Sequence, residues 1–214
     1  VRYFEESFEQ YVPYSTNPLF NVEGRDVYLK DIVALICLLD HPENKRRKRI
    51  YISDHSMFVT YFKNADFTME RLVRIAKKLR LEHRFNGYIH LKSIPGASEE
   101  LLTEAGLYAD RLSINLEMPT EEGLKLVAPD KSHADVQKPL GFVNNKIIQL
   151  KDEKKLIKSV PKFAPAGQST QMVIGATPEN DFQIMSIANQ YYNDYNLKRV
   201  YYSGFIPINH NDTL

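Results

Sequence analysis

The chain has 214 residues, 43% hydrophobic and 26% charged, which is ordinary for a globular protein with one substantial core. Its formal net charge of +1 gives no global electrostatic attraction to nucleic acid or to a membrane surface. No apolar run approaches the roughly 20 residues that cross a bilayer, and the single cysteine, Cys37, excludes an internal disulfide framework. We therefore expect a cytoplasmic protein with no membrane partner.

Residues 1–65 carry weak signals, and we treat them as a poorly assigned N-terminal segment. Asp31–Leu39 is a short apolar run that fits either a buried strand or a helix. Five basic residues, Lys45–Arg49, precede a β-rich stretch, Ile50–Ser53, and form either a solvated loop or a contact to a nucleic-acid backbone. Because the chain lacks an initial methionine and ends soon after a strand, we expect a fragment of a longer protein.

Helix and strand signals alternate from residue 66 onward. Four apolar runs with polar ends predict strands, and capping residues predict the helices between them. The strands are Tyr88–Ser93, Arg111–Glu117, Gln171–Gly175 and Arg199–Gly204; helices begin at Asp66 or Thr68, Ser98 (ending at Gly106), Thr120 and Thr177, with a polar loop over 129–140 and a helix over 141–160. This alternation predicts an α/β fold with parallel strands, and polar strand ends are typical of a β/α barrel.

Two polar pairs mark the strand ends. Asn115 and Glu117 are two residues apart on one strand and point to the same side, where an amide and a carboxylate suit the diol of a sugar. Alternatively, Glu117 caps the next helix or pairs with Lys92. His90 and Lys92 also share a face, either as acid/base or phosphate-binding groups or as a structural ion pair.

The segment Val173–Glu179 predicts a strand, a glycine and a helix start. Gly175 would let a flat ring approach the backbone, and a plain turn between strand and helix is the alternative. The segment has neither a dinucleotide fingerprint nor a P-loop. The histidines show no metal-ligand spacing and no Ser-His-Asp order occurs, so the residue pattern assigns no metal site and no catalytic residue.

Six longer segments carry a resemblance to a known family. They are Phe67–Leu72, Phe85–Ala97, Ala105–Glu117, Leu126–Lys131, Phe163–Met172 and Val200–Pro207. Over about residues 66–214 the chain resembles bacterial radical S-adenosylmethionine (radical SAM) proteins assigned to DNA modification or repair. The resemblance implies a partial β/α barrel, a 4Fe-4S cluster, S-adenosylmethionine cleaved to a 5′-deoxyadenosyl radical, and association with DNA and a uracil-DNA-glycosylase-like protein.

The resemblance also implies S-adenosylmethionine-binding roles for seven residues at strand ends. Asn115 and Glu117 would contact the ribose, and the backbone of Ile174 and Gly175 would contact the adenine. Tyr202 and Ser203 would flank the adenine, and Ser53 would contact the methionyl group. The polar pair His90 and Lys92 is left as a candidate for substrate binding.

One departure from the family pattern concerns the iron–sulfur cluster. The family holds its cluster with three cysteines spaced C-x-x-x-C-x-x-C. This chain has only Cys37, and one thiolate cannot hold the cluster in that manner. Two interpretations follow: a radical SAM enzyme represented incompletely, or a non-catalytic, barrel-like binding or scaffold protein without the cluster. A third is a nucleic-acid-binding module that uses Lys45–Arg49 and the C-terminal tyrosines.

Overall fold

The computed structural model describes residues 10–14, 19–22, 25–28, 49–54 and 65–205, the first four of these ranges as backbone strands. The apolar run Asp31–Leu39 and residues 45–48 of the basic run lie outside them. None of the helices within the described ranges combines the length and the apolar character that a membrane span requires.

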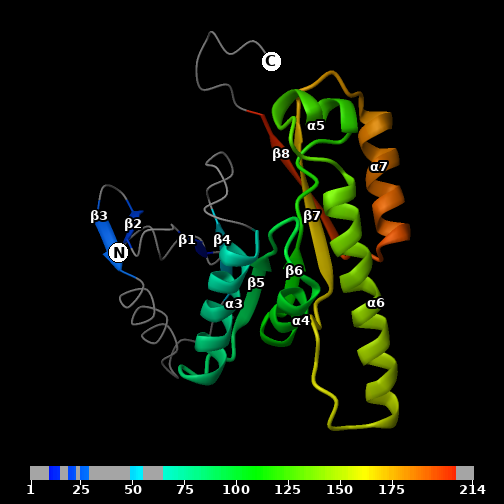
Figure 1. Cartoon of the computed structure of the whole chain (residues 1–214). Coiled ribbons are helices and arrows are strands. Elements are labelled where there is room, and N and C mark those ends of the chain that lie inside the picture. Colours follow the sequence, from blue (N-terminus) through cyan, green and yellow to red (C-terminus); the bar gives the residue numbers. More distant parts are fainter. Residues whose placement is uncertain (1–9, 15–18, 23–24, 29–48, 55–64, 206–214) are drawn as a thin grey trace.

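A six-stranded parallel sheet organises the described part of the chain (Figure 1). All five pairings between neighbouring strands are parallel, and a separate antiparallel pair, β2 (Leu19–Val22) and β3 (Arg25–Tyr28), lies outside this sheet. The prediction of an α/β fold with parallel strands is therefore confirmed. In spatial order the six strands are β1 (Gln10–Tyr14), β4 (Arg49–Asp54), β5 (Tyr88–Lys92), β6 (Arg111–Ser113), β7 (Gln168–Ile174) and β8 (Arg199–Gly204).

Strand order in the sheet follows chain order without a reversal. Parallel strands are joined by right-handed crossovers, so an unreversed order places the connecting helices on one face of the sheet. A doubly wound sheet, by contrast, reverses its strand order and carries helices on both faces. The helices within the described ranges are α3 (Ala65–Leu81), α4 (Glu99–Tyr108), α5 (Glu121–Val127), α6 (Ala134–Leu156) and α7 (Asp181–Asp194).

Alternate strand positions bury apolar side chains against these helices. Ile89, Leu91 and Leu112 join a core cluster with α3, α4 and α6, and Met172 and Val200 join a second with α6 and α7. The intervening strand positions point to the opposite face because successive side chains of a strand alternate. That opposite face is polar, and it carries Tyr88, His90, Lys92, Arg111, Ser113, Ser169, Gln171, Arg199, Tyr201 and Ser203.

Two helix starts differ from the sequence-based predictions. The predicted start at Thr177 is wrong: α7 begins at Asp181 behind Asn180, whose side chain and that of Gln183 each accept from the other residue's backbone N–H at 3.0 Å. This capping box provides acceptors for free backbone N–H groups at the helix start, so the helix begins there. The polar stretch 129–140 is not a loop throughout, because α6 begins at Ala134 and contains Pro139 in its second turn.

The strand and helix ends before residue 120 also differ. The regular pairing of β6 stops at Ser113 instead of Glu117, and an isolated bridge then pairs Glu117 with Met172. Helix α4 runs two residues beyond Gly106, which lies inside it. A Cβ at Gly106 would meet the Phe163 ring at 2.1 Å, so this glycine permits close packing and does not end the helix.

Candidate binding site at the carboxyl edge of the sheet

A cavity of about 420 Å³ lies at the carboxyl edge of the sheet. One wall comes from the chain after β6 and another from the segment between α5 and α6, while the loop after β5 and the start of α3 close the opposite side. Its lining residues are Asn115, Leu116, Glu117, Leu124, Asp130, Lys131, Ser132, Asp135, Val136, Ala65, Pro95 and Gly96. The lining therefore combines carboxylates, an amine, an amide and a hydroxyl on an apolar base.

Asn115 and Glu117 both line this cavity. Asn115 is 5% exposed, and the Glu117 side chain is 17% exposed. The Glu117 backbone has a φ of 67°, and the N–H of Met118 donates to the Leu116 carbonyl at 2.9 Å, which makes a three-residue turn. Such a turn is costly for a residue with a side chain and is concentrated at binding sites.

Strand β7 holds this turn in place from the other side. The Glu117 N–H donates to the Gln171 carbonyl at 3.1 Å, and the Val173 N–H donates to the Glu117 carbonyl at 2.6 Å. Both backbone groups of Glu117 are thus fixed, so the direction of its side chain is fixed as well.

Lys92 at the end of β5 pairs with Glu117 across the strands, with Nζ 3.8 Å from Oε1. Glu117 therefore pairs with Lys92, which was the alternative considered for it, and it also lines the cavity. The second oxygen, Oε2, is buried and has no hydrogen-bond partner among the described residues. A buried carboxylate oxygen without a donor is costly, so a ligand hydroxyl there would be favourable.

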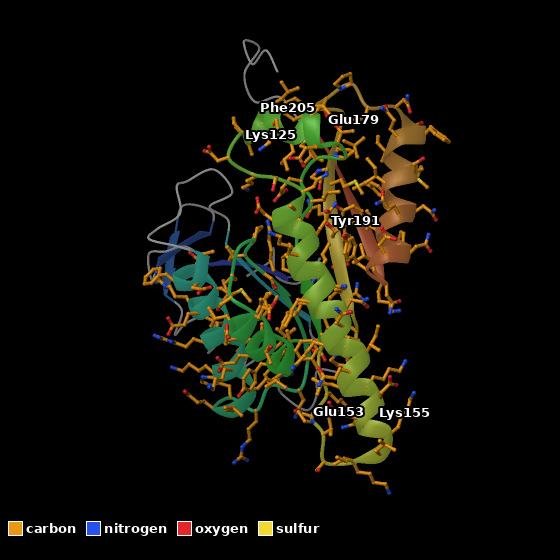
Figure 2. The ribbon with its side chains drawn as sticks, turned by 45° about the vertical axis from the view of Figure 1, so that its right-hand side comes forward. Lys125, Glu153, Lys155, Glu179, Tyr191 and Phe205 are labelled. Atoms are coloured by element: carbon orange, nitrogen blue, oxygen red, sulfur yellow. The ribbon has the colours of Figure 1, made fainter. Side chains whose placement is uncertain are left out.

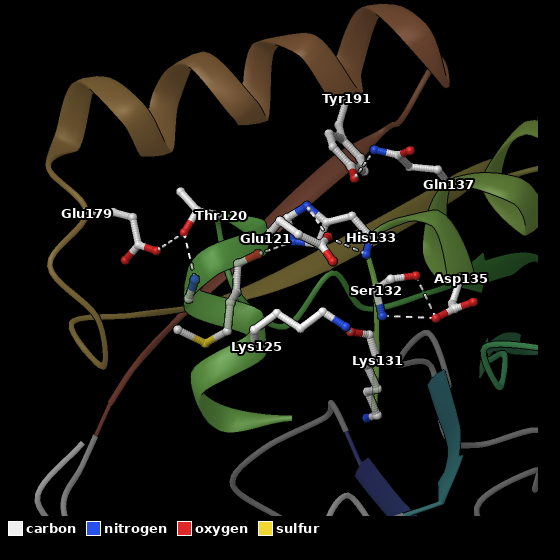
Figure 3. Close-up of polar contacts among 12 residues, drawn as sticks. Thr120, Glu121, Lys125, Lys131, Ser132, His133, Asp135, Gln137, Glu179 and Tyr191 are labelled. Carbon is white, nitrogen blue, oxygen red and sulfur yellow. Dashed lines mark hydrogen bonds and ion pairs between the residues drawn. The ribbon is translucent and has the colours of Figure 1, made fainter. Parts of the chain in front are cut away.

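Glu179 joins the loop after β7 to the helix after β6 (Figure 3). Its carboxylate accepts hydrogen bonds from the hydroxyls of Thr120 and Thr177. Burial raises the pKa of Glu179, but these hydrogen bonds outweigh burial and hold the pKa below its ordinary value. Thr120 also caps α5 as predicted, accepting from the Gly123 N–H at 3.0 Å. The contact fixes the loop that contains Gly175 relative to the cavity wall.

His133 and Asp135 order the other wall of the cavity (Figure 3). The His133 ring nitrogen Nε2 lies 3.0 Å from the Met118 carbonyl, and its backbone N–H donates to Glu121 at 2.8 Å. Asp135 accepts from both the N–H and the hydroxyl of Ser132, at 2.9 and 2.8 Å. These bonds fix the turn that carries Asp130 and Lys131 to the cavity.

Gly175 directly follows β7, at the same edge as Glu179 and Phe205 (Figure 2). Its φ is 88°, and apart from its chain neighbours no atom of the described residues lies within 4 Å of the position that a Cβ would occupy. The Ile174 carbonyl beside it accepts from the Phe205 N–H at 2.8 Å.

Tyr202 and Ser203 do not come together. They are neighbours on β8, so their side chains point to opposite faces of the sheet. Ser203 lies on the polar face and its hydroxyl accepts from the Gln171 amide, whereas Tyr202 lies on the helix-covered face and is 48% exposed. Ser53 is the penultimate residue of β4, at the carboxyl end of its strand, and it pairs with Pro13 of β1.

His90 lies on the polar face, deeper along β5 than Lys92. It is 5% exposed, and burial, followed by the nearby Arg111 and Arg199 guanidinium groups, lowers the pKa of its imidazole to about 3. His90 is therefore neutral at physiological pH. This favours a structural or hydrogen-bonding role over proton transfer near neutrality.

The described residues do not supply the ligands of an iron–sulfur cluster. They contain no group of three or more His, Cys, Asp or Glu side chains that could hold a metal ion, and Cys37 lies outside them. The carboxylate, amine, amide and hydroxyl groups on the cavity can donate and accept hydrogen bonds.

Sequence reasoning missed the contribution of the α5–α6 segment. Asp130, Lys131, Ser132 and Asp135 were predicted only as part of a polar loop, although all four line the cavity. The spacing of Ser132 and Asp135 is a local signal for the start of α6, but no local signal places this segment at the cavity. No known family model matches the chain, and no curated protein has a similar sequence.

Proposed function

We propose that the carboxyl edge of the sheet binds S-adenosylmethionine, and that the chain is part of a radical SAM-type β/α barrel that acts in DNA modification or repair. The observation that carries the proposal is the convergence of Asn115 and Glu117 on one cavity, with an oxygen of Glu117 left without a donor. The reaction class, DNA and the uracil-DNA-glycosylase-like partner rest on the resemblance of residues 66–214.

Strand order supports the barrel part of the proposal. A parallel sheet whose strands follow chain order, with helices on one face, is the arrangement from which a β/α barrel is built. The polar face would then line the inside of a partial barrel. Ligands in such folds bind at the carboxyl ends of the strands, where the cavity lies.

The cavity groups complement the parts of S-adenosylmethionine. The Glu117 carboxylate would accept from the ribose hydroxyls, and the Asn115 amide both donates and accepts. Asp130 and Lys131, on the wall between α5 and α6, offer charges that complement an ammonium and a carboxylate. The open backbone at Gly175 would admit the adenine ring.

Calorimetric titration with S-adenosylmethionine tests this assignment. Glu117→Ala and Asn115→Ala should each weaken binding by about 1–3 kcal/mol, because each leaves ligand hydroxyls unpaired. Glu100→Ala, an exposed acid in the first turn of α4, is the matched control and should bind as the wild type does. The ribose assignment is wrong if both cavity variants retain wild-type affinity, or if the wild type does not bind.

A non-catalytic binding protein on the same fold is the second candidate. The observation that favours it is the single cysteine, Cys37. Iron and sulfide analysis after anaerobic reconstitution separates the two candidates. About four irons per chain would support the radical enzyme. S-Adenosylmethionine binding without iron would support a binding protein that lacks the cluster.

A further inference from the structure

Arg111 is a buried cation without a counter-ion among the described residues. It begins β6 on the polar face and is 8% exposed. One terminal nitrogen donates to the Ala166 carbonyl at 3.1 Å, but Nε is buried without a hydrogen-bond partner, and no carboxylate among the described residues pairs with this guanidinium. A buried charge with no partner costs several kcal/mol, so an anion beside Arg111 would be stabilising.

Ser169 and Arg199 lie on the same polar face, on the next two strands. Ser169 is fully buried, and its hydroxyl also lacks a hydrogen-bond partner among the described residues. In the sheet register Ser169 pairs with Ser113 of β6 on one side and with Arg199 of β8 on the other. The orphaned hydroxyl of Ser169 therefore stands beside the Arg199 strand position, and the orphaned Nε of Arg111 belongs to the neighbouring strand β6, two residues before Ser113.

Within the described part of the chain, the surroundings of these three residues add no unpaired carboxylate. Burial and then the guanidinium groups of Arg111 and Arg199 lower the pKa of His90, so its imidazole stays neutral. The centroid of its ring is 6.4 Å from that of Tyr201. The Tyr88 hydroxyl is close enough to both arginines that they lower its pKa, although burial raises it overall. The nearby carboxylate of Asp110 is already held by Arg80 at 2.7 Å.

We propose that Arg111, Ser169 and Arg199 form a binding site for a phosphate-type oxyanion on the polar face of the sheet. The donor set of two guanidinium groups and a hydroxyl matches the acceptor oxygens of phosphate, which arginine binds with paired hydrogen bonds. None of these three residues lines the cavity at the carboxyl edge. In the sheet register Arg111 lies opposite His90, two residues before Lys92 on β5.

Calorimetry and thermal unfolding with inorganic phosphate, against sodium chloride at matched ionic strength, test the site. Phosphate should stabilise the wild type saturably and chloride should not. Arg199→Gln and Ser169→Ala should lower the phosphate affinity, the former by about tenfold, since a charge-assisted hydrogen bond is lost. Arg74→Gln, which removes an exposed arginine of α3, is the control and should bind as the wild type does.

Arg111→Lys keeps the charge but loses the planar guanidinium, and it should bind phosphate more weakly. If it fails to fold, Arg199→Gln still tests the proposal, because Arg199 is exposed and outside the core. The proposal is overturned if phosphate stabilises no more than chloride does, or if Arg199→Gln and Ser169→Ala both bind as the wild type does.

A short dT oligonucleotide that displaces phosphate would identify a nucleic-acid phosphate as the ligand; phosphate binding without displacement would identify a small phosphate. Both results support the site.

Discussion

The Nζ atom of Lys92 lies 3.8 Å from Oε1 of Glu117, and 17% of each side chain is exposed. Replacing Lys92 with Met should lower the free energy of unfolding by about 1–2 kcal/mol, because it leaves a half-buried carboxylate without its counter-charge. Urea unfolding of Lys92→Met, Glu117→Gln and the double variant measures the coupling. Strictly additive losses would show that the two charges do not interact.

Glu179 should stabilise the fold in a pH-dependent manner. The folded state holds the pKa of this carboxyl below its ordinary value of 4.5. The ionised carboxylate therefore adds stability above pH 4.5, and this stability is lost as pH falls through the folded pKa. Wild type should therefore exceed Glu179→Gln in unfolding free energy at neutral pH, and the difference should shrink below about pH 4. A difference that stays constant across this range would contradict the role given to the Thr120 and Thr177 hydroxyls.

His90 should make the wild type lose stability in acid. Its folded pKa of about 3 lies below the ordinary 6.5, so the unfolded chain binds the additional proton between these values. Stability from this group is full above pH 6.5 and falls as pH drops toward 3. From pH 6 to pH 4 the wild type should lose about 2–3 kcal/mol relative to His90→Gln in urea unfolding. Parallel pH profiles would rule this out.

Two helical glycines should respond in opposite directions to alanine. At Gly106 the new Cβ would meet the Phe163 ring at 2.1 Å, whereas at Gly141 the nearest atom, in Tyr195, is 3.9 Å away. Gly106→Ala should destabilise by about 1–3 kcal/mol through overpacking. Gly141→Ala should stabilise by up to about 1 kcal/mol through helix propensity. Thermal unfolding of both variants checks the pair, and equal shifts would be inconsistent with the packing described.

Local signals predicted most strands and the alternation of the fold. The span Arg199–Gly204 is a strand as predicted, and Thr120 caps a helix. Those elements have strong local determinants: β-branched and aromatic residues in one case and a capping hydroxyl in the other. The parallel arrangement followed because strands and helices alternate.

Long-range contacts determine the roles of two acidic residues that local signals misassigned. Asp66 looks like a helix cap, but its carboxylate accepts from the Ser98 N–H at 2.6 Å, 32 residues away. Glu179 likewise looks like a first-turn acid but bonds to Thr120, 59 residues earlier. In the site, Asn115 and Glu117 could be singled out because they lie two residues apart at the end of one apolar run. The wall from Asp130 to Asp135 could not, because it reaches the cavity only through the tertiary fold.

Ribose recognition by Glu117 is best tested by the binding of adenosine and of 2′,3′-dideoxyadenosine to the wild type and to Glu117→Ala. The wild type should prefer the nucleoside with both hydroxyls by about 1–3 kcal/mol. Glu117→Ala should lose most of this preference, because the variant removes the acceptor of the hydrogen bonds whose donors the dideoxynucleoside lacks. Equal affinity of the wild type for the two nucleosides, or a preference unchanged in Glu117→Ala, would contradict ribose recognition at this edge of the sheet.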